Sequence, residues 1–114
     1  MFAAHHRLSN LIAVVDVNGM QALGRTRDVL NMDPLGRRWE AFGWLACEAD
    51  GHDEADLLAA LTDGIAQRTG PAVILAQTVL GKGVSFMEDK LEWHYRNLPP
   101  ELDDLALAET RNRI

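Results

Sequence analysis

The sequence predicts an α/β fold in which a partial, doubly wound parallel sheet carries helices on both faces. Residues 11–17 and 72–79 are near-continuous apolar runs, which is typical of parallel strands that are covered on both sides. Helical segments alternate with the predicted strands, as in right-handed β–α–β crossovers. Only three strands are predicted. Since such a sheet needs cover on both faces and at both edges, the chain looks like the second half of a doubly wound domain.

The first half of the chain begins with a predicted helix over residues 1–9 and continues with the strand over residues 11–17. Asn18-Gly19 ends this strand, because both residue types permit a sharp turn and glycine readily takes positive φ. A long loop follows over residues 19–34, with a short helical piece near residues 27–30. Pro34 then opens a helix over residues 35–42, since proline suits the start of a helix.

The second half of the chain continues the alternation of strands and helices. A short strand is predicted over residues 44–48, followed by a helix over residues 54–68 that Asp53 can cap. Apolar side chains recur along this helix at spacings of three and four, which places them on one stripe. They are Leu57, Leu58, Leu61 and Ile65. The strand over 72–79 comes next, and after a loop a terminal helix covers residues 101–109.

Composition and charge exclude several classes of function. The 114 residues are 47% hydrophobic and 25% charged, which is close to the globular average and sufficient for one core. A net charge of -6 without any basic run argues against nucleic-acid binding. The apolar runs fall short of the ~18 residues of a membrane helix, and no secretory signal is visible. With Cys47 as its single cysteine, the chain is expected in the cytoplasm.

The turn after the first predicted strand is the strongest candidate for a ligand site, because open parallel sheets bind ligands at the carboxyl ends of their strands. Asn18 offers an amide oxygen, and the turn exposes backbone carbonyls such as that of Met20. Mg²⁺ accepts such oxygens but usually also needs a carboxylate and substrate phosphates. From these residues alone, a turn that merely ends a strand is the simpler interpretation.

Five blocks of sequence carry a more specific pattern. They are residues 3–11 (AAHHRLSNL), 15–21 (VDVNGMQ), 39–44 (WEAFGW), 50–53 (DGHD) and 81–88 (GKGVSFME), the last followed by Trp93-His94. In this order and spacing they resemble the thiamine diphosphate-binding domain of transketolases, and they cover nearly the whole chain. The resemblance implies that residues 1–114 form the second half of that domain, with thiamine diphosphate and Mg²⁺ as cofactors.

The resemblance also implies roles for individual residues. Asn18 matches the asparagine that closes the family's Gly-Asp-Gly…Asn motif, and its side-chain oxygen would bind Mg²⁺. Met20 stands where a backbone carbonyl supplies another metal ligand, and Gly19 lies between the two in the cofactor-binding turn. His94 matches a histidine that reaches the diphosphate and the substrate, where it would form a hydrogen bond and act catalytically in proton movement.

Part of the family's site has no counterpart in the sequence. The chain contains no Gly-Asp-Gly, which carries the metal-binding aspartate, and the predicted first helix starts at Phe2 without a cap residue. The family's pyrimidine-binding domain, with the glutamate that activates the cofactor, has no counterpart either. We therefore expect other transketolase subunits to supply the Gly-Asp-Gly loop and the pyrimidine-binding domain, in a hetero-oligomer that this chain completes.

The implied reaction transfers a two-carbon ketol unit from a ketose to an aldose, usually as sugar phosphates. The cofactor would carry the difficult chemistry, and the protein would hold and orient it. Two alternatives stay open: a non-catalytic scaffold or regulatory remnant that keeps the fold, and another thiamine diphosphate-dependent carboligase that releases carbon dioxide.

Other candidate groups are predicted to be structural. His5 and His6 are adjacent on a helix and point about 100° apart, so packing is a better interpretation than a shared metal ion. Asp16 is expected to support the turn at Asn18. Cys47, in a predicted buried strand, is expected to be unreactive. Lys82 stands between two glycines, a pattern that indicates a backbone turn, since the full phosphate-loop motif is missing.

Overall fold

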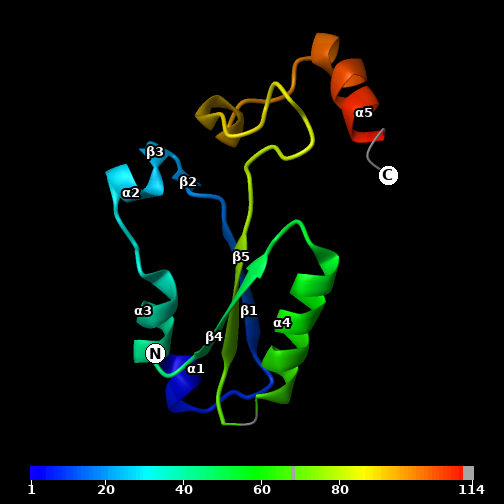
Figure 1. Cartoon of the computed structure of the whole chain (residues 1–114). Coiled ribbons are helices and arrows are strands. Elements are labelled where there is room, and N and C mark those ends of the chain that lie inside the picture. Colours follow the sequence, from blue (N-terminus) through cyan, green and yellow to red (C-terminus); the bar gives the residue numbers. More distant parts are fainter. Residues whose placement is uncertain (68, 112–114) are drawn as a thin grey trace. The chain divides into compact units, whose positions relative to one another are not determined.

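Two compact units make up the chain in the computed structural model, which describes residues 1–67 and 69–111. The first unit comprises Met1–Val17 and Asn31–Thr78, and it contains the parallel sheet. The second comprises Asn18–Leu30 and Val79–Ile114, and it contains the turn at Asn18-Gly19 and the segment with His94. Figure 1 shows the course of the chain through these elements.

The sheet of the first unit has three parallel strands, as predicted. They are β1 (Ile12–Val17), β4 (Leu45–Asp50) and β5 (Ala72–Gln77), in the order β1-β5-β4. The last strand in sequence thus lies in the centre and pairs with both neighbours. Its continuous apolar sequence fits that place, because Val73, Leu75 and the rest of β5 up to Ala76 are buried on both faces.

Helices cover the two faces of this sheet, which confirms the predicted architecture (Figure 1). α4 (Glu54–Ala66) packs on the face that carries Ile74, where Ala60 and Ala49 complete a small buried cluster. α3 (Leu35–Ala41) lies on the face that carries Leu75, since successive strand residues point to opposite sides. A Cβ built on Gly36 of α3 would lie 3.6 Å from Leu75 Cδ1, so the helix approaches the sheet closely.

α4 begins where its capping residue predicts. Asp53 Oδ1 accepts hydrogen bonds from the N–H groups of Ala55 (2.8 Å) and Asp56 (3.2 Å), two of the donors that a helix start leaves unpaired. The helix ends at Ala66, with Gln67 as its C-cap. The predicted end at Arg68 lies outside the described residues.

The first helix is shorter than the predicted span of residues 1–9. α1 covers Phe2–His5, and the chain then turns through Arg7 at φ 50°. The N–H of Arg7 bonds to Ala4 O, and the N–H of Leu8 bonds to Ala3 O. These two bonds are those of a Schellman motif, which ends a helix with a left-handed residue. The prediction was wrong because the left-handed residue that ends such a helix is usually glycine. Arginine at position 7 does not indicate a helix end.

The predicted loop over residues 19–34 is also wrong in part. β2 (Met20–Gln21) and β3 (Gly24–Arg25) form a small antiparallel hairpin that leads into α2 (Thr26–Val29). The predicted helical piece is therefore present, about one residue earlier than expected. The hairpin was not predicted because two strands of two residues each leave no readable alternation in the sequence.

The rest of the second unit follows the glycine-rich turn. Gly81 has φ 69°, and a Cβ built there would lie 2.7 Å from Met87 Cβ, so the turn requires glycine as predicted. Two 3₁₀ helices follow, η1 (Leu91–His94) and η2 (Pro100–Leu102), and then α5 (Asp103–Arg111). The predicted loop up to Pro100 thus contains a helical turn that ends at His94. Over the part of the chain that the structure describes, no helix has the length and apolar character to cross a membrane.

The cap of α4 makes a stability prediction. Replacing Asp53 by alanine leaves two helix N–H groups without their acceptor and should lower the free energy of unfolding by about 1 kcal/mol. Urea denaturation followed by circular dichroism measures the change. Asp53→Asn keeps an accepting oxygen and should lose much less, so equal losses for both variants would contradict this role of the side chain.

Candidate cofactor-binding site

The turn after β1 is fixed by the side chain of Asn18. The N–H of Met20 donates to Asn18 Oδ1 at 2.9 Å, which closes a turn of the kind that asparagine forms with the backbone two residues on. Gly19 has φ 69° between them, the left-handed conformation predicted for it. Asn18 and Met20 are both half-buried. The amide oxygen of Asn18 is thereby oriented, and an amide oxygen has a second lone pair for another partner.

The hairpin orients the carbonyl of Met20. The N–H of Thr26 donates to Gly19 O at 2.9 Å, so Gly19 and Thr26 face each other as a hydrogen-bonded pair. Such pairs alternate with non-hydrogen-bonded pairs along antiparallel strands. Met20, which lies opposite Arg25, therefore directs its backbone groups away from β3. Its N–H turns to Asn18, and its C=O points to the outer edge of the hairpin.

These two oxygens suit part of a hard-cation site. Neutral amide and backbone carbonyl oxygens are accepted ligands of Mg²⁺, which usually also takes a carboxylate and substrate phosphates. Within residues 1–67 and 69–111 no group of three or more His, Cys, Asp or Glu side chains could hold a metal ion. The donor set present fits the neutral side of a magnesium site and lacks the acidic side.

Asp16 was predicted to support the turn at Asn18, but its side chain bonds elsewhere. Its carboxylate Oδ1 accepts a hydrogen bond from the hydroxyl of Thr78, directly after β5. The register of the sheet explains this partner, since Asp16 lies opposite Ala76 and Val17 opposite Gln77. The carboxylate nearest in sequence to Asn18 therefore ties together the ends of two strands in the first unit.

His94 ends η1 and is exposed, with its ring edge-on to Tyr95 at a centroid distance of 5.5 Å. The preceding residue anchors the segment, because Trp93 Nε1 donates to Phe86 O at 2.9 Å and the two rings pack edge to face. η1 contacts β2 within the second unit. The structure thus brings the segment that carries His94 to the strand that carries Met20, although 74 positions separate them in sequence.

An ion pair that the sequence did not reveal lies beside these residues. Arg25 Nη1 donates to Asp89 Oδ1 at 2.7 Å, and Nη2 donates to Oδ2, so the guanidinium and the carboxylate form a bidentate pair. The hydrogen bond and the opposite charge raise the pKa of Arg25 and lower the pKa of Asp89. The pair connects the hairpin to the loop that precedes η1.

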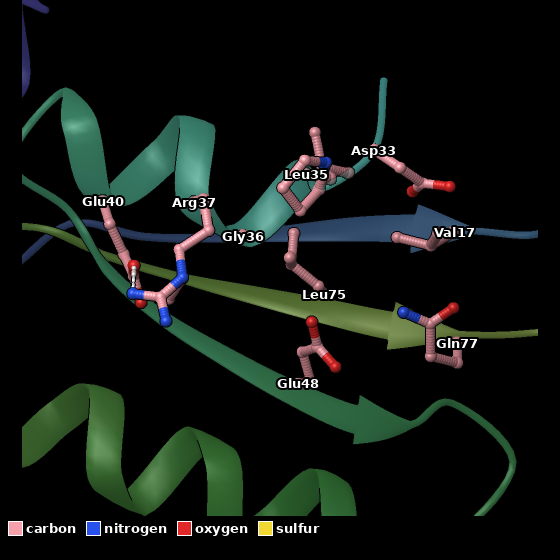
Figure 2. A pocket seen from close by; sticks show the side chains of 11 residues that line it. Val17, Asp33, Leu35, Gly36, Arg37, Glu40, Glu48, Leu75 and Gln77 are labelled. Carbon is pink, nitrogen blue, oxygen red and sulfur yellow. Dashed lines mark hydrogen bonds and ion pairs between the residues drawn. The ribbon is translucent and has the colours of Figure 1, made fainter. Parts of the chain in front are cut away.

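A pocket of about 600 Å³ lies in the first unit, on the face of the sheet that α3 covers (Figure 2). Its charged lining consists of Asp33, Glu40 and Glu48 against Arg37, which bonds to Glu40 at 3.0 Å. Three carboxylates and one paired guanidinium would repel a diphosphate or a sugar phosphate. None of the predicted site residues lines this pocket. It is therefore not a candidate for the cofactor's phosphates.

The fold places the chain among open parallel α/β domains, which bind ligands at the carboxyl ends of their strands. A family model described as transketolase, thiamine diphosphate binding domain, matches residues 1–112. The chain therefore belongs to this family, which confirms the resemblance seen in its five sequence blocks.

Relatives support the same family. The chain is 39% identical over 109 residues to a 6-deoxy-6-sulfo-D-fructose transketolase subunit of Clostridium sp. (strain MSTE9). It is 38% identical over 110 residues to an apulose-4-phosphate transketolase subunit of Actinobacillus succinogenes. Each match covers 96% of this chain and 40% of the relative, so the chain spans less than half the length of these proteins.

A solved structure agrees in fold. The crystal structure of transketolase from Campylobacter jejuni superposes with a TM-score of 0.83 at 25% sequence identity, covering 98% of this chain and 17% of that one. The match extends over nearly all of the chain and a small part of the larger enzyme. The chain therefore shares the fold of part of a transketolase, in agreement with its thiamine diphosphate-binding domain family.

Cys47 provides a prediction about reactivity. Burial, and secondarily the negative charge of Asp63, raise the pKa of its thiol. Since the thiolate is the reactive form, alkylation by iodoacetamide at pH 8 should be several-fold slower than in the chain unfolded by urea. Mass spectrometry of timed samples measures both rates. Equal rates would contradict the packing role and would reopen Cys47 as a functional thiol.

Proposed function

We propose that this chain is one component of a split transketolase-like enzyme that acts only with partner chains. The names of two relatives, both transketolase subunits, support this assignment. The reaction is the transfer of a two-carbon ketol unit from a ketose to an aldose, both as sugar phosphates. The single cysteine, Cys47, supports placing the enzyme in the cytoplasm.

The observation that carries the proposal is the pair of oriented oxygens at the turn after β1. Asn18 Oδ1 and the Met20 carbonyl would bind Mg²⁺, with Gly19 allowing the diphosphate to approach the backbone between them. Thiamine diphosphate, when bound, supplies the carbanion centre that accepts the ketol unit. His94, exposed on η1, would hydrogen-bond to the diphosphate and substrate and would help to move a proton.

The partner chains would supply what this donor set lacks. Two neutral oxygens bind Mg²⁺ weakly unless a carboxylate joins them. We propose that one partner brings the aspartate of a Gly-Asp-Gly loop and that another part of the assembly brings the pyrimidine-binding domain with its activating glutamate. The share of the relatives that this chain covers, 40%, leaves room for such segments.

The edge of the sheet at β1 is the proposed docking surface for the Gly-Asp-Gly partner. β1 pairs only with β5 among the described residues, so its other edge can accept a parallel strand. Val14 is 63% exposed on the face that α4 covers, although its neighbour Ile12 packs into the cluster there. An apolar strand that is left half-covered in this way fits a sheet that a further strand and helix complete.

The apolar stripe of α4 continues this surface. Leu57 packs on the sheet, whereas Leu58, Leu61 and Ile65 are 63%, 38% and 56% exposed. Asp56, which accepts the N–H of Asp50 at the end of β4, lies on roughly the opposite side of the helix from Leu58, at ~100° per residue. A Cβ built on Gly64, the neighbour of Ile65, would lie 3.5 Å from Ile12 Cδ1, so the end of the stripe at Ile65 lies near β1.

Asn18 tests the metal site in the reconstituted assembly. Asn18→Ala removes one proposed ligand and the hydrogen bond to Met20, so the Mg²⁺ concentration for half-maximal activity should rise at least ~10-fold. Asn18→Asp keeps an oxygen acceptor and should retain much of the affinity. Asn31→Ala is the matched control, because Asn31 Oδ1 also accepts a backbone N–H, that of Asp33, away from the proposed site.

Ile65 tests the docking surface. Ile65→Glu places a charge in the exposed stripe and should weaken assembly with the partner at least ~10-fold, since buried interface anchors cannot accommodate an unpaired charge. Ala59→Glu, on another side of α4, is the control and should assemble normally. Analytical ultracentrifugation of the mixed chains measures both. Equal assembly of the two variants would show that the partner docks elsewhere.

The alternative functions differ in products. A decarboxylating carboligase would release carbon dioxide during turnover, and a scaffold would show no turnover that depends on Asn18. Calorimetry separates the split site from a complete one: the purified chain alone should bind thiamine diphosphate and Mg²⁺ weakly, and tight binding by the chain alone would refute the proposed division of ligands.

A further inference from the structure

We propose that the Arg25–Asp89 ion pair is a positioning device that holds the metal-binding hairpin against the segment that carries His94. The inference rests on the function proposed above for the turn at Asn18. Arg25 lies directly opposite Met20 in the hairpin, and Asp89 lies just before η1. One bidentate contact thus joins the two segments that would meet at the cofactor, across 64 positions of sequence.

The geometry of the pair fixes direction as well as distance. Two parallel bonds between a planar guanidinium and a carboxylate restrict rotation in a way that a single bond does not. Both side chains are roughly half-exposed, at 44% and 48%. Exposed ion pairs contribute little stability on average, whereas bidentate ones retain their specificity of geometry. The Arg25–Asp89 pair is therefore expected to affect the placement of the hairpin more than the stability of the second unit.

The backbone of Asp89 supports a role for its side chain. Its φ is 57°, a left-handed conformation that glycine takes without strain and that aspartate tolerates at some cost. The N–H of Asp89 donates to Leu80 O at 2.9 Å, and the N–H of Lys90 donates to Met87 O at 3.1 Å, so the loop fixes this conformation. Backbone requirements alone favour glycine here, and the carboxylate is what aspartate adds.

Loss of the pair should affect binding before turnover. The hairpin would remain tied at Gly19–Thr26, but its end at Arg25 would no longer be held to the loop before η1. The Met20 carbonyl would then sample positions that do not suit a metal bound to the diphosphate that His94 contacts. The apparent affinity falls in proportion to the fraction of molecules with the hairpin in place.

Asp89→Gly in the assembled enzyme is the decisive variant. It removes the carboxylate and places glycine at a left-handed backbone position, which relieves the strain there. The thermal unfolding midpoint should therefore stay equal or rise. The Kd for Mn²⁺, used as the probe and followed by electron paramagnetic resonance, should nevertheless rise ~10-fold. The KM for thiamine diphosphate should rise similarly, with kcat at saturation nearly unchanged. Amide hydrogen exchange at Met20 and Thr26 should quicken.

Further variants separate geometry from charge. Arg25→Lys keeps the positive charge but loses the planar guanidinium and therefore the bidentate contact. Its Kd for Mn²⁺ should lie between those of the wild type and Asp89→Gly. Arg37→Ala breaks an exposed pair elsewhere, Arg37–Glu40, and should leave the Kd unchanged. A wild-type Kd and KM in both Asp89→Gly and Arg25→Lys would overturn the proposal. Asn18→Ala, measured alongside, tests the proposed metal site itself. If Asn18→Ala also binds Mn²⁺ with the wild-type Kd, the proposed metal site is wrong. If Asn18→Ala binds Mn²⁺ poorly while Asp89→Gly and Arg25→Lys bind it normally, only the positioning role is wrong.

Discussion

The hydrogen bond from the Met20 N–H to Asn18 Oδ1 is the interaction on which the candidate site depends. It converts the end of the edge strand β1 into a turn with two oriented oxygens, and the left-handed Gly19 makes that geometry possible. The hairpin then directs the Met20 carbonyl outward, because Gly19 and Thr26 take the paired position beside it. A few local rules of backbone hydrogen bonding thus produce a donor set that suits a hard cation.

Much of the sheet could be predicted from the sequence, because its signals are local. The continuous apolar run of β5 indicated a strand covered on both faces, and Asp53 marked the start of α4 through its short polar side chain. The hairpin at Met20 escaped prediction because its strands are too short to show a period. The Arg25–Asp89 pair escaped because exposed charges 64 positions apart resemble a solvated surface until the fold joins them.

The apolar stripe of α4 was predicted correctly from its spacing, but this sheet covers only part of it. Its spacing predicted one apolar face, yet the sheet covers Leu57 and leaves Leu58 and Ile65 largely exposed. The stripe is wider than the contact that this sheet offers, and Val14 of β1 is exposed on the same face. Relatives of which this chain spans 40% are consistent with a larger sheet in which both would be covered.

The central place of β5 has a consequence for synthesis on the ribosome. β1 and β4 pair with β5 and not with each other, so no part of the sheet can form until residues 72–77 have left the exit tunnel. At about 5–20 residues per second, the nascent chain carries two apolar segments without partners for several seconds. Such late, non-local closure is slow and exposes the chain to aggregation. Chaperone binding during that interval is the expected protection, and slowing translation before β5 would lengthen it.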